Sequence, residues 1–140
     1  MISTLIAEAT TCDFKEALEV KKPKSWLKSV SAFANTAGGT LFFGVDNAHN
    51  VVGLTDPQKD AEDISRLIKE RISPIPRFIL TAEQEYGKAV LVLSIPKGTH
   101  TPYYYKADGL REAYIRRGDE SMVAPDHILH ELILDGMNES

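Results

Sequence analysis

Apolar residues recur at spacings of three and four in three stretches of the chain, the pattern of helices that bury one face. The first stretch covers about residues 23–36 and stops at Gly38-Gly39, where glycine easily adopts a left-handed cap. The second opens at Asp56-Pro57, an N-cap aspartate followed by a proline suited to the first helical position. The third begins at Pro125. The sequence therefore predicts three helices.

Shorter apolar or alternating runs predict the strands. Residues 78–85 and 88–95, joined at Tyr86-Gly87, indicate a hairpin. The remaining short strands are expected at residues 12–15, 40–45, 51–53, 103–105 and 113–116. The order β-α-β-β-α-β-β-β-β-α predicts an α+β fold (α/β mixed), in which a mixed β-sheet packs with about three helices.

The composition is that of an ordinary globular protein: 140 residues, 43% hydrophobic and 26% charged. We expect a single domain over residues 1–140, since no linker or repeat divides the chain. No apolar run approaches the ~20 residues of a membrane span, and the start does not resemble a signal peptide. The one cysteine, Cys12, excludes an internal disulfide and a cysteine-built zinc site. These features predict a cytoplasmic protein without a membrane partner.

The net charge of −4 argues against indiscriminate binding of nucleic acid, but the charges are unevenly spread. Residues 15–28 hold five lysines and only two glutamates. The lysines are Lys15, Lys21, Lys22, Lys24 and Lys28. A second basic group consists of Arg111, Arg116 and Arg117, diluted by nearby acids. A local basic face is therefore possible, although the sequence does not show whether the two groups share one surface.

Aromatic and arginine residues alternate between residues 103 and 118. Tyr104 and Tyr114 could stack on bases while the arginines pair with phosphates. The alternative is a hairpin whose tyrosines pack on one face. The candidate nucleic-acid contacts are the five lysines, the three arginines and these two tyrosines.

Three acids are candidates for catalysis: Glu8, Asp13 and Asp46. Three carboxylates could hold a divalent cation for phosphodiester cleavage if the fold brings them together. The alternative is that they are solvated surface acids. Asp13 is also expected to raise the pKa of the neighbouring Cys12 thiol.

An ATP-binding loop is not indicated. Gly38-Gly39 follows a helix, whereas phosphates bind at the start of one, and the chain lacks the Gly-x-x-x-x-Gly-Lys-Ser/Thr pattern.

One segment has a specific Ala-Asn-Thr-x-Gly-Gly core, with Asn35, Gly38, Gly39 and, further on, Gly44. Further distinctive segments contain Glu8 and Asp13-Phe-Lys15, Gly44-Val-Asp46, Val52-Gly53, Ile72-Ser-Pro74, Pro102-Tyr-Tyr-Tyr-Lys106 and Tyr114-Ile-Arg-Arg-Gly118. Together these segments resemble the Schlafen AlbA-type domain, the Alba-like DNA-binding domain of many bacterial regulators. The resemblance covers about residues 8–134.

This resemblance implies a nucleic-acid-binding, specifically DNA-binding, domain at the N-terminus of a longer bacterial transcriptional regulator. Some members carry an ATP-binding description, which the missing phosphate loop does not support here. A different implication is a metal-dependent endoribonuclease, because vertebrate Schlafen cores cut tRNA and rRNA with a divalent metal. Glu8, Asp13 and Asp46 would then be the catalytic and metal-binding residues, with Mg²⁺ or Mn²⁺ as cofactor.

Two positions depart from the nuclease pattern. Asp13 stands where the family usually has glutamate, and Asn47 replaces the usual second acid after Gly-Val-Asp. A third implication is a dimerisation or ligand-sensing domain, with a homodimer as the expected assembly.

Overall fold

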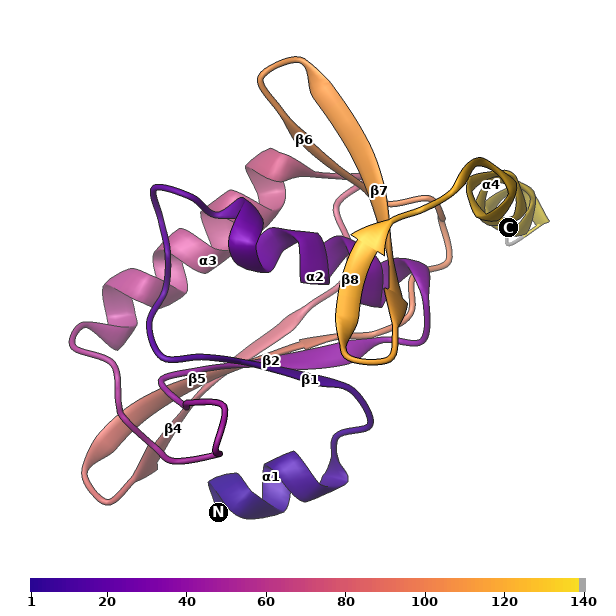
Figure 1. The fold of residues 1–140 in the computed structure, drawn as a ribbon. Helices are drawn as coiled ribbons and strands as arrows, with labels where there is room; N and C mark the ends of the chain where they lie inside the picture. The colour runs from indigo at the N-terminus through magenta and orange to yellow at the C-terminus, as the bar shows by residue number, and fades with distance from the viewer. Residues whose placement is uncertain (139–140) are drawn as a thin grey trace.

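Two four-stranded β-sheets enclose one buried helix, α2 (Lys24–Asn35), in the computed structural model, which describes residues 1–138 (Figure 1). The other helices are α1 (Ile2–Glu8), α3 (Pro57–Arg71) and α4 (Asp126–Asn138). The strands are β1 (Cys12–Lys15), β2 (Gly39–Phe43), β3 (Ile72–Ser73), β4 (Ile79–Glu85), β5 (Lys88–Ile95), β6 (Tyr104–Ala107), β7 (Leu110–Arg117) and β8 (Glu120–Val123). The fold is mixed α+β, as the sequence predicts.

The first sheet has the order β1-β2-β5-β4 and is covered on both faces. β1 runs parallel to β2, and the remaining neighbours are antiparallel. Leu41 and Phe43 of β2 pack into the main core with α2 and α3, while Phe42 points to the opposite face, toward Ile2 of α1. β2 is therefore apolar at successive positions, as expected of a strand buried on both sides.

The second sheet is antiparallel, with the order β3-β6-β7-β8. Its inner face packs on α2 through Tyr105 and Tyr114, and its outer face packs on α4 through Ala113 and Ile115. Leu132 is the α4 residue most deeply buried in that contact. Because successive side chains of a strand point to opposite faces, β7 divides its residues between two environments.

The sequence locates most elements within one or two residues, with five differences. They concern α1, α2, β3, β8 and residues 51–53. The expected strand at residues 51–53 is reduced to a single bridge between Val45 and Val51. α1 and β8 were not expected, because a seven-residue helix is too short to show a period and β8 begins with polar residues. The two-residue strand β3 follows α3 directly and pairs only with β6. α2 is buried nearly all round, rather than along one stripe.

Two polar side chains inside α2 hold the second sheet in place. Tyr103 and Tyr114 lie opposite each other just beyond the last β6–β7 pair, Tyr104 with Ala113. Asn35 accepts from the Tyr103 backbone N–H at 2.7 Å and donates to the carbonyls of Tyr103 (2.9 Å) and Tyr114 (2.8 Å). Ser31 donates to the Tyr103 carbonyl and accepts from the Tyr114 N–H. These two side chains therefore satisfy backbone groups that the strands leave unpaired.

The glycines of the motif serve the packing around α2. Gly38 has φ +80° and would place a Cβ 2.9 Å from the carbonyl oxygen of Ile95. At Gly39 a Cβ would lie 2.6 Å from the ring of Phe33. Gly44 has φ +99°, a conformation that glycine adopts without strain. The motif that carries the family resemblance is thus structural at Asn35, Gly38, Gly39 and Gly44.

We predict that Asn35→Ala lowers the free energy of unfolding by about 2 kcal/mol or more. Each buried backbone group left without a partner costs about 1–3 kcal/mol. This change leaves two without one, the Tyr103 N–H and the Tyr114 carbonyl, because Ser31 still donates to the Tyr103 carbonyl. Urea unfolding followed by circular dichroism measures the loss. Asn47→Ala is the control, because Asn47 is exposed and makes no side-chain hydrogen bond within residues 1–138. A loss below about 1 kcal/mol for Asn35→Ala would contradict this role.

Candidate nucleic-acid interface

A cavity of about 570 Å³ lies where the N-terminal end of α2 meets β7 and β8. Three lysines, Lys22, Lys24 and Lys28, line it together with one acid, Glu19. Tyr114 and the β8 residues 121–123 form its opposite wall. We call this cavity the lysine groove. It is lined by three of the five lysines predicted from the sequence to contact nucleic acid. With three lysines and one glutamate, its lining has an excess of positive charge.

The lysine groove adjoins a second cavity of about 290 Å³, because Ser25, Lys28 and Ser121 line both. Lys15 reaches this second cavity and donates to the Ser25 carbonyl at 3.3 Å. Lys21 and Lys22 line a further hollow beside the groove. All five lysines therefore lie along one connected stretch of surface, which also contains Asp13, Asp119 and Glu120 at the second cavity.

Lys24 is held in place at the groove by two partners. Its Nζ lies 3.2 Å from Glu112 Oε1, and the Tyr114 hydroxyl donates to the same carboxylate at 3.1 Å. The hydrogen bond with Tyr114, and then that with Glu112, raises the pKa of Lys24, so the ammonium stays charged. Burial raises the pKa of the Tyr114 hydroxyl. The Tyr114 residue is only 4% exposed, so its ring packs in the core and offers no open face for a base.

The candidate arginines and tyrosines lie on two different faces of the second sheet. They are Arg111, Arg116, Arg117, Tyr104 and Tyr114. Tyr114 and Arg116 point inward, toward α2. Arg111 points outward and stacks on Tyr104, with its guanidinium carbon 4.3 Å from the ring centroid. The same alternation places Arg117 on the outer face. Arg111, Arg117 and Tyr104 therefore do not join the lysine groove, whereas Arg116 lines the cavity beside it.

Asp13 and Arg116 form an ion pair that joins the two sheets. Arg116 donates to both carboxylate oxygens of Asp13, at 2.6 and 3.0 Å. The Asp13 carboxylate also accepts from Ser29 of α2, and Arg116 donates to Ser121 of β8 at 2.9 Å. The Arg116 side chain is 6% exposed and also contacts the ring of Phe33. Each charge is thus bound by the other, and the pair links β1, α2, β7 and β8.

The other two candidate acids lie apart from this pair. Glu8 is the exposed last residue of α1. Asp46 is bound within its own loop, where its carboxylate accepts from the backbone N–H groups of Ala48 (2.9 Å) and Asn50 (2.8 Å). Within residues 1–138, no three acids, histidines or cysteines are grouped so that they could hold a metal ion. The residues present therefore do not fit the divalent cation that a Schlafen-type nuclease would use.

Cys12 lies beside the ion pair and is only partly exposed. Burial raises the pKa of its thiol, and the Asp13 carboxylate raises it further. This agrees with the direction expected from the sequence, and a protonated thiol is a poor nucleophile.

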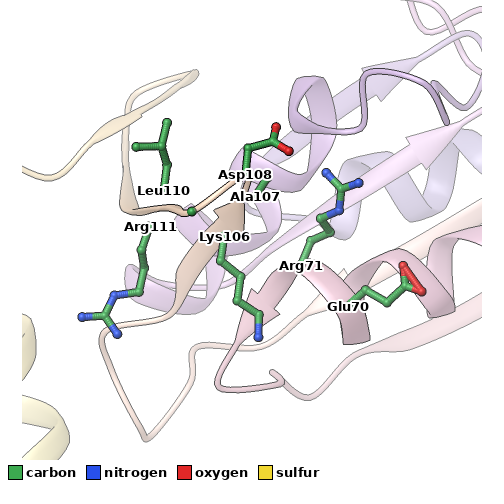
Figure 2. A pocket seen from close by; sticks show the side chains of 8 residues that line it. Glu70, Arg71, Lys106, Ala107, Asp108, Leu110 and Arg111 are labelled. Carbon is green, nitrogen blue, oxygen red and sulfur yellow. The ribbon is translucent and has the colours of Figure 1, made fainter.

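The tip of the β6–β7 hairpin carries a second basic cluster that the sequence analysis missed in part (Figure 2). Arg71, at the end of α3, and Lys106 lie with Arg111 around an open hollow of about 490 Å³. Figure 2 shows the three cationic side chains extending in different directions, and Glu70 and Asp108 line the same hollow. The cluster therefore does not converge on one ligand position.

α4 presents an exposed apolar edge. Ile133, Leu134 and Met137 are 37%, 59% and 73% exposed. The homodimer expected from the sequence remains a prediction, and these side chains are where a contact between copies would form. Among the described residues, none of the helices has the length and apolar character needed to cross a bilayer.

Two sheets around a buried helix, with the Asn35 motif at their junction, define an AlbA-like domain. The chain belongs to the Schlafen AlbA_2 family, whose model matches residues 8–125. A similar solved structure is the N-terminal domain of a RecG-related protein from Nitrosomonas europaea, named for its relation to an ATP-dependent DNA helicase. It shares 31% sequence identity, with a TM-score of 0.62, over 90% of this chain and 93% of that one.

A second similar structure is the DIP2311 protein from Corynebacterium diphtheriae. The identity is 22% and the TM-score 0.60, over 81% of this chain and 22% of that protein. At this identity the likeness shows the fold alone.

We predict that the Asp13–Arg116 pair stabilises the fold through mutual dependence. Arg116→Met should lower the free energy of unfolding by about 2–3 kcal/mol, because it leaves a largely buried carboxylate without its cation. The double variant Asp13→Asn/Arg116→Met should lose less than the sum of the single variants, by about 1 kcal/mol or more. Denaturant unfolding of all three measures this coupling. Arg117→Met, at an exposed neighbour, should change stability by less than about 0.5 kcal/mol, and strict additivity of the pair would contradict the prediction.

We predict that the pKa of Asp46 lies below the ordinary aspartate value of about 3.9. The Asn50 backbone N–H lowers it most, outweighing burial, with help from the Asn50 side chain and the Ala48 N–H. The stabilisation of this loop is therefore fully present above that ordinary value and is lost as the pH falls through the lowered pKa. Carboxyl ¹³C NMR titration reports it directly. A raised pKa, as carboxylates sharing one site show, would contradict the separation of the acids.

Proposed function

We propose that this chain is a nucleic-acid-binding module that binds the phosphate backbone through the lysine groove. The observation that carries the proposal is the convergence of Lys22, Lys24 and Lys28 on one cavity, with Lys15 and Lys21 beside it. Lysine ammonium groups neutralise phosphates and release their counterions, which supplies affinity without sequence readout.

The N-terminus of α2 adds a second feature that favours an anion. Its N-cap residue is Pro23, which makes no side-chain capping bond, and its first turn contains no acid. Lys24 and Lys28 instead place positive charge at the positive end of the helix dipole, an arrangement that costs stability. A bound phosphate would relieve that repulsion. α3 shows the usual arrangement, with Asp56 accepting from the Lys59 N–H and basic residues in the last turn.

Family membership and the similar structure agree with this proposal. The relative from Nitrosomonas europaea is named after a helicase that acts on DNA. The module would serve a longer bacterial transcriptional regulator, with DNA as its ligand. Base recognition would then come from another region, because Tyr114 is buried and Tyr104 is covered by Arg111.

The alternative of a metal-dependent endoribonuclease gains no support from the geometry. Asp13 is bound by Arg116 and Ser29, and Asp46 is bound by its own loop. The proposed action is therefore binding without cleavage.

We predict that the triple variant Lys22→Gln/Lys24→Gln/Lys28→Gln binds duplex DNA at least about tenfold more weakly at 0.1 M salt. The slope of log K against log[salt] should fall in magnitude by about 2–3, since each lost phosphate contact contributes about 0.7–0.9. Fluorescence anisotropy over a salt series, with labelled DNA and tRNA, measures both quantities.

The matched control is Lys59→Gln/Lys69→Gln/Lys88→Gln, which removes the same charge from α3 and β5. It should retain most of the affinity and the slope. Equal losses in both triple variants would show a general charge effect rather than a groove. Products run on a gel with Mn²⁺ should remain full length, and metal-dependent shortening would overturn binding without cleavage.

A further inference from the structure

A separate cavity of about 270 Å³ lies between the segment that follows β3 and the loop that joins β5 to β6. Three basic residues line it: Arg77, Lys97 and His100. No acid contributes to its lining. By contrast, at least one acid lines each of three others: the lysine groove, the adjoining cavity that contains Asp13, and the hollow at the tip of the β6–β7 hairpin. Its other walls come from Ile75, Gly98, Thr99 and Tyr103.

A buried hydroxyl forms part of this cavity. Tyr103 is 4% exposed, and its oxygen accepts a hydrogen bond from the His100 backbone N–H at 3.0 Å. A phenol can also donate one, and within residues 1–138 the Tyr103 hydroxyl has no acceptor. The hydroxyl proton is therefore available to a ligand in the cavity, beside the cationic side chains.

The loop that joins β5 to β6 is held in place by contacts with α2 and with Tyr103. The Gly98 N–H donates to the Ala34 carbonyl, at the end of α2, at 2.8 Å. A Cβ at Gly98 would lie 2.2 to 2.4 Å from atoms of the Tyr103 ring and hydroxyl, so only glycine allows this close approach. Asn35 holds the backbone of the same tyrosine. The hydroxyl and the loop are thus positioned before any ligand arrives.

The position also explains how two like charges, on Arg77 and Lys97, persist together. The loop lies against the C-terminal end of α2, where the helix dipole carries partial negative charge that favours cations. That partial charge offsets only part of their repulsion, and a compact dianion would offset it more completely. A cavity of this size is slightly below the ~300–1,000 Å³ of typical ligand pockets, which favours a small anion over a whole nucleotide.

We propose that this cavity binds a phosphate group, held by Arg77 and Lys97 with Tyr103 as a hydrogen-bond donor. Arginine recognises phosphate oxygens through paired N–H donors, and lysine binds them as a point charge. This site uses none of the residues of the lysine groove and does not depend on the proposed function.

Inorganic phosphate is the first probe, titrated into ¹⁵N-labelled protein with chloride at matched ionic strength as reference. The backbone amides of Gly98, Thr99 and His100 should shift saturably with phosphate and not with chloride. Arg77→Gln and Lys97→Gln should each weaken binding about tenfold, as expected for a hydrogen bond to a charged group. Tyr103→Phe should weaken it by a similar factor. Lys69→Gln, at an exposed lysine of α3, should leave it unchanged.

The proposal is overturned if phosphate and chloride act alike, or if Arg77→Gln and Lys97→Gln bind phosphate as the unmodified protein does. These two changes lie on exposed side chains, so they test the site even if Tyr103→Phe disturbs the core. The triple variant of the lysine groove should bind phosphate here normally. Loss of phosphate binding in that variant would also overturn a separate site.

A second arm separates the two sources of a phosphate group. Matched oligonucleotides with a 5′-phosphate or a 5′-hydroxyl are compared on the triple variant of the lysine groove. Shifts of the same three amides with the 5′-phosphate alone support a nucleic-acid end as the ligand. Shifts with inorganic phosphate but with neither oligonucleotide support a free phosphate or a small phosphate ester.

Discussion

The insertion of Asn35 and Ser31 between Tyr103 and Tyr114 is the constraint on which the arrangement of the two sheets depends. A helix between two sheets normally offers them only apolar contacts, which resist sliding poorly because the hydrophobic effect is not directional. Here two side chains of α2 make the hydrogen bonds that the backbones at Tyr103 and Tyr114 do not make with each other. Their donors and acceptors match specific backbone groups of the second sheet. Any shift of the sheet along the helix would break these bonds in a buried setting, where unpaired groups are costly.

The Asp13–Arg116 pair adds a second directional contact, nearer the surface. It joins β1 of the first sheet to β7 of the second, with Ser29 and Ser121 completing the network. Together the two polar networks fix how β7 and β8 lie over α2. That relation determines the lysine groove, because one wall comes from the α2 region and the other from these strands.

The sequence predicts the fold well where local pattern decides it and the site poorly where distant partners decide it. The apolar run of β2, the caps of α3 and the β4–β5 hairpin follow from neighbouring residues. The role of the Asp13 carboxylate depends on Arg116, which is 103 positions away in the sequence. No local sequence signal therefore distinguishes an ion-pair partner from a metal ligand. One available signal was missed: the two-residue period of β7 already separates Arg111 and Arg117 from Tyr114 and Arg116.

The basic cavity at Tyr103 was beyond sequence reasoning for a related reason. Arg77 belongs to one loop and Lys97 and His100 to another, and only the folded chain brings them together, with the second loop held against the end of α2. The two ends of α2 then differ in their local electrostatics. At the C-terminal end, basic residues agree with the helix dipole, whereas at the N-terminal end Lys24 and Lys28 oppose it. Burial of α2 on nearly every side supplies the stability that tolerates this opposition. Glu112 offsets part of the unfavourable charge at the N-terminal end through its ion pair with Lys24, and under the proposed function a bound anion would offset the rest.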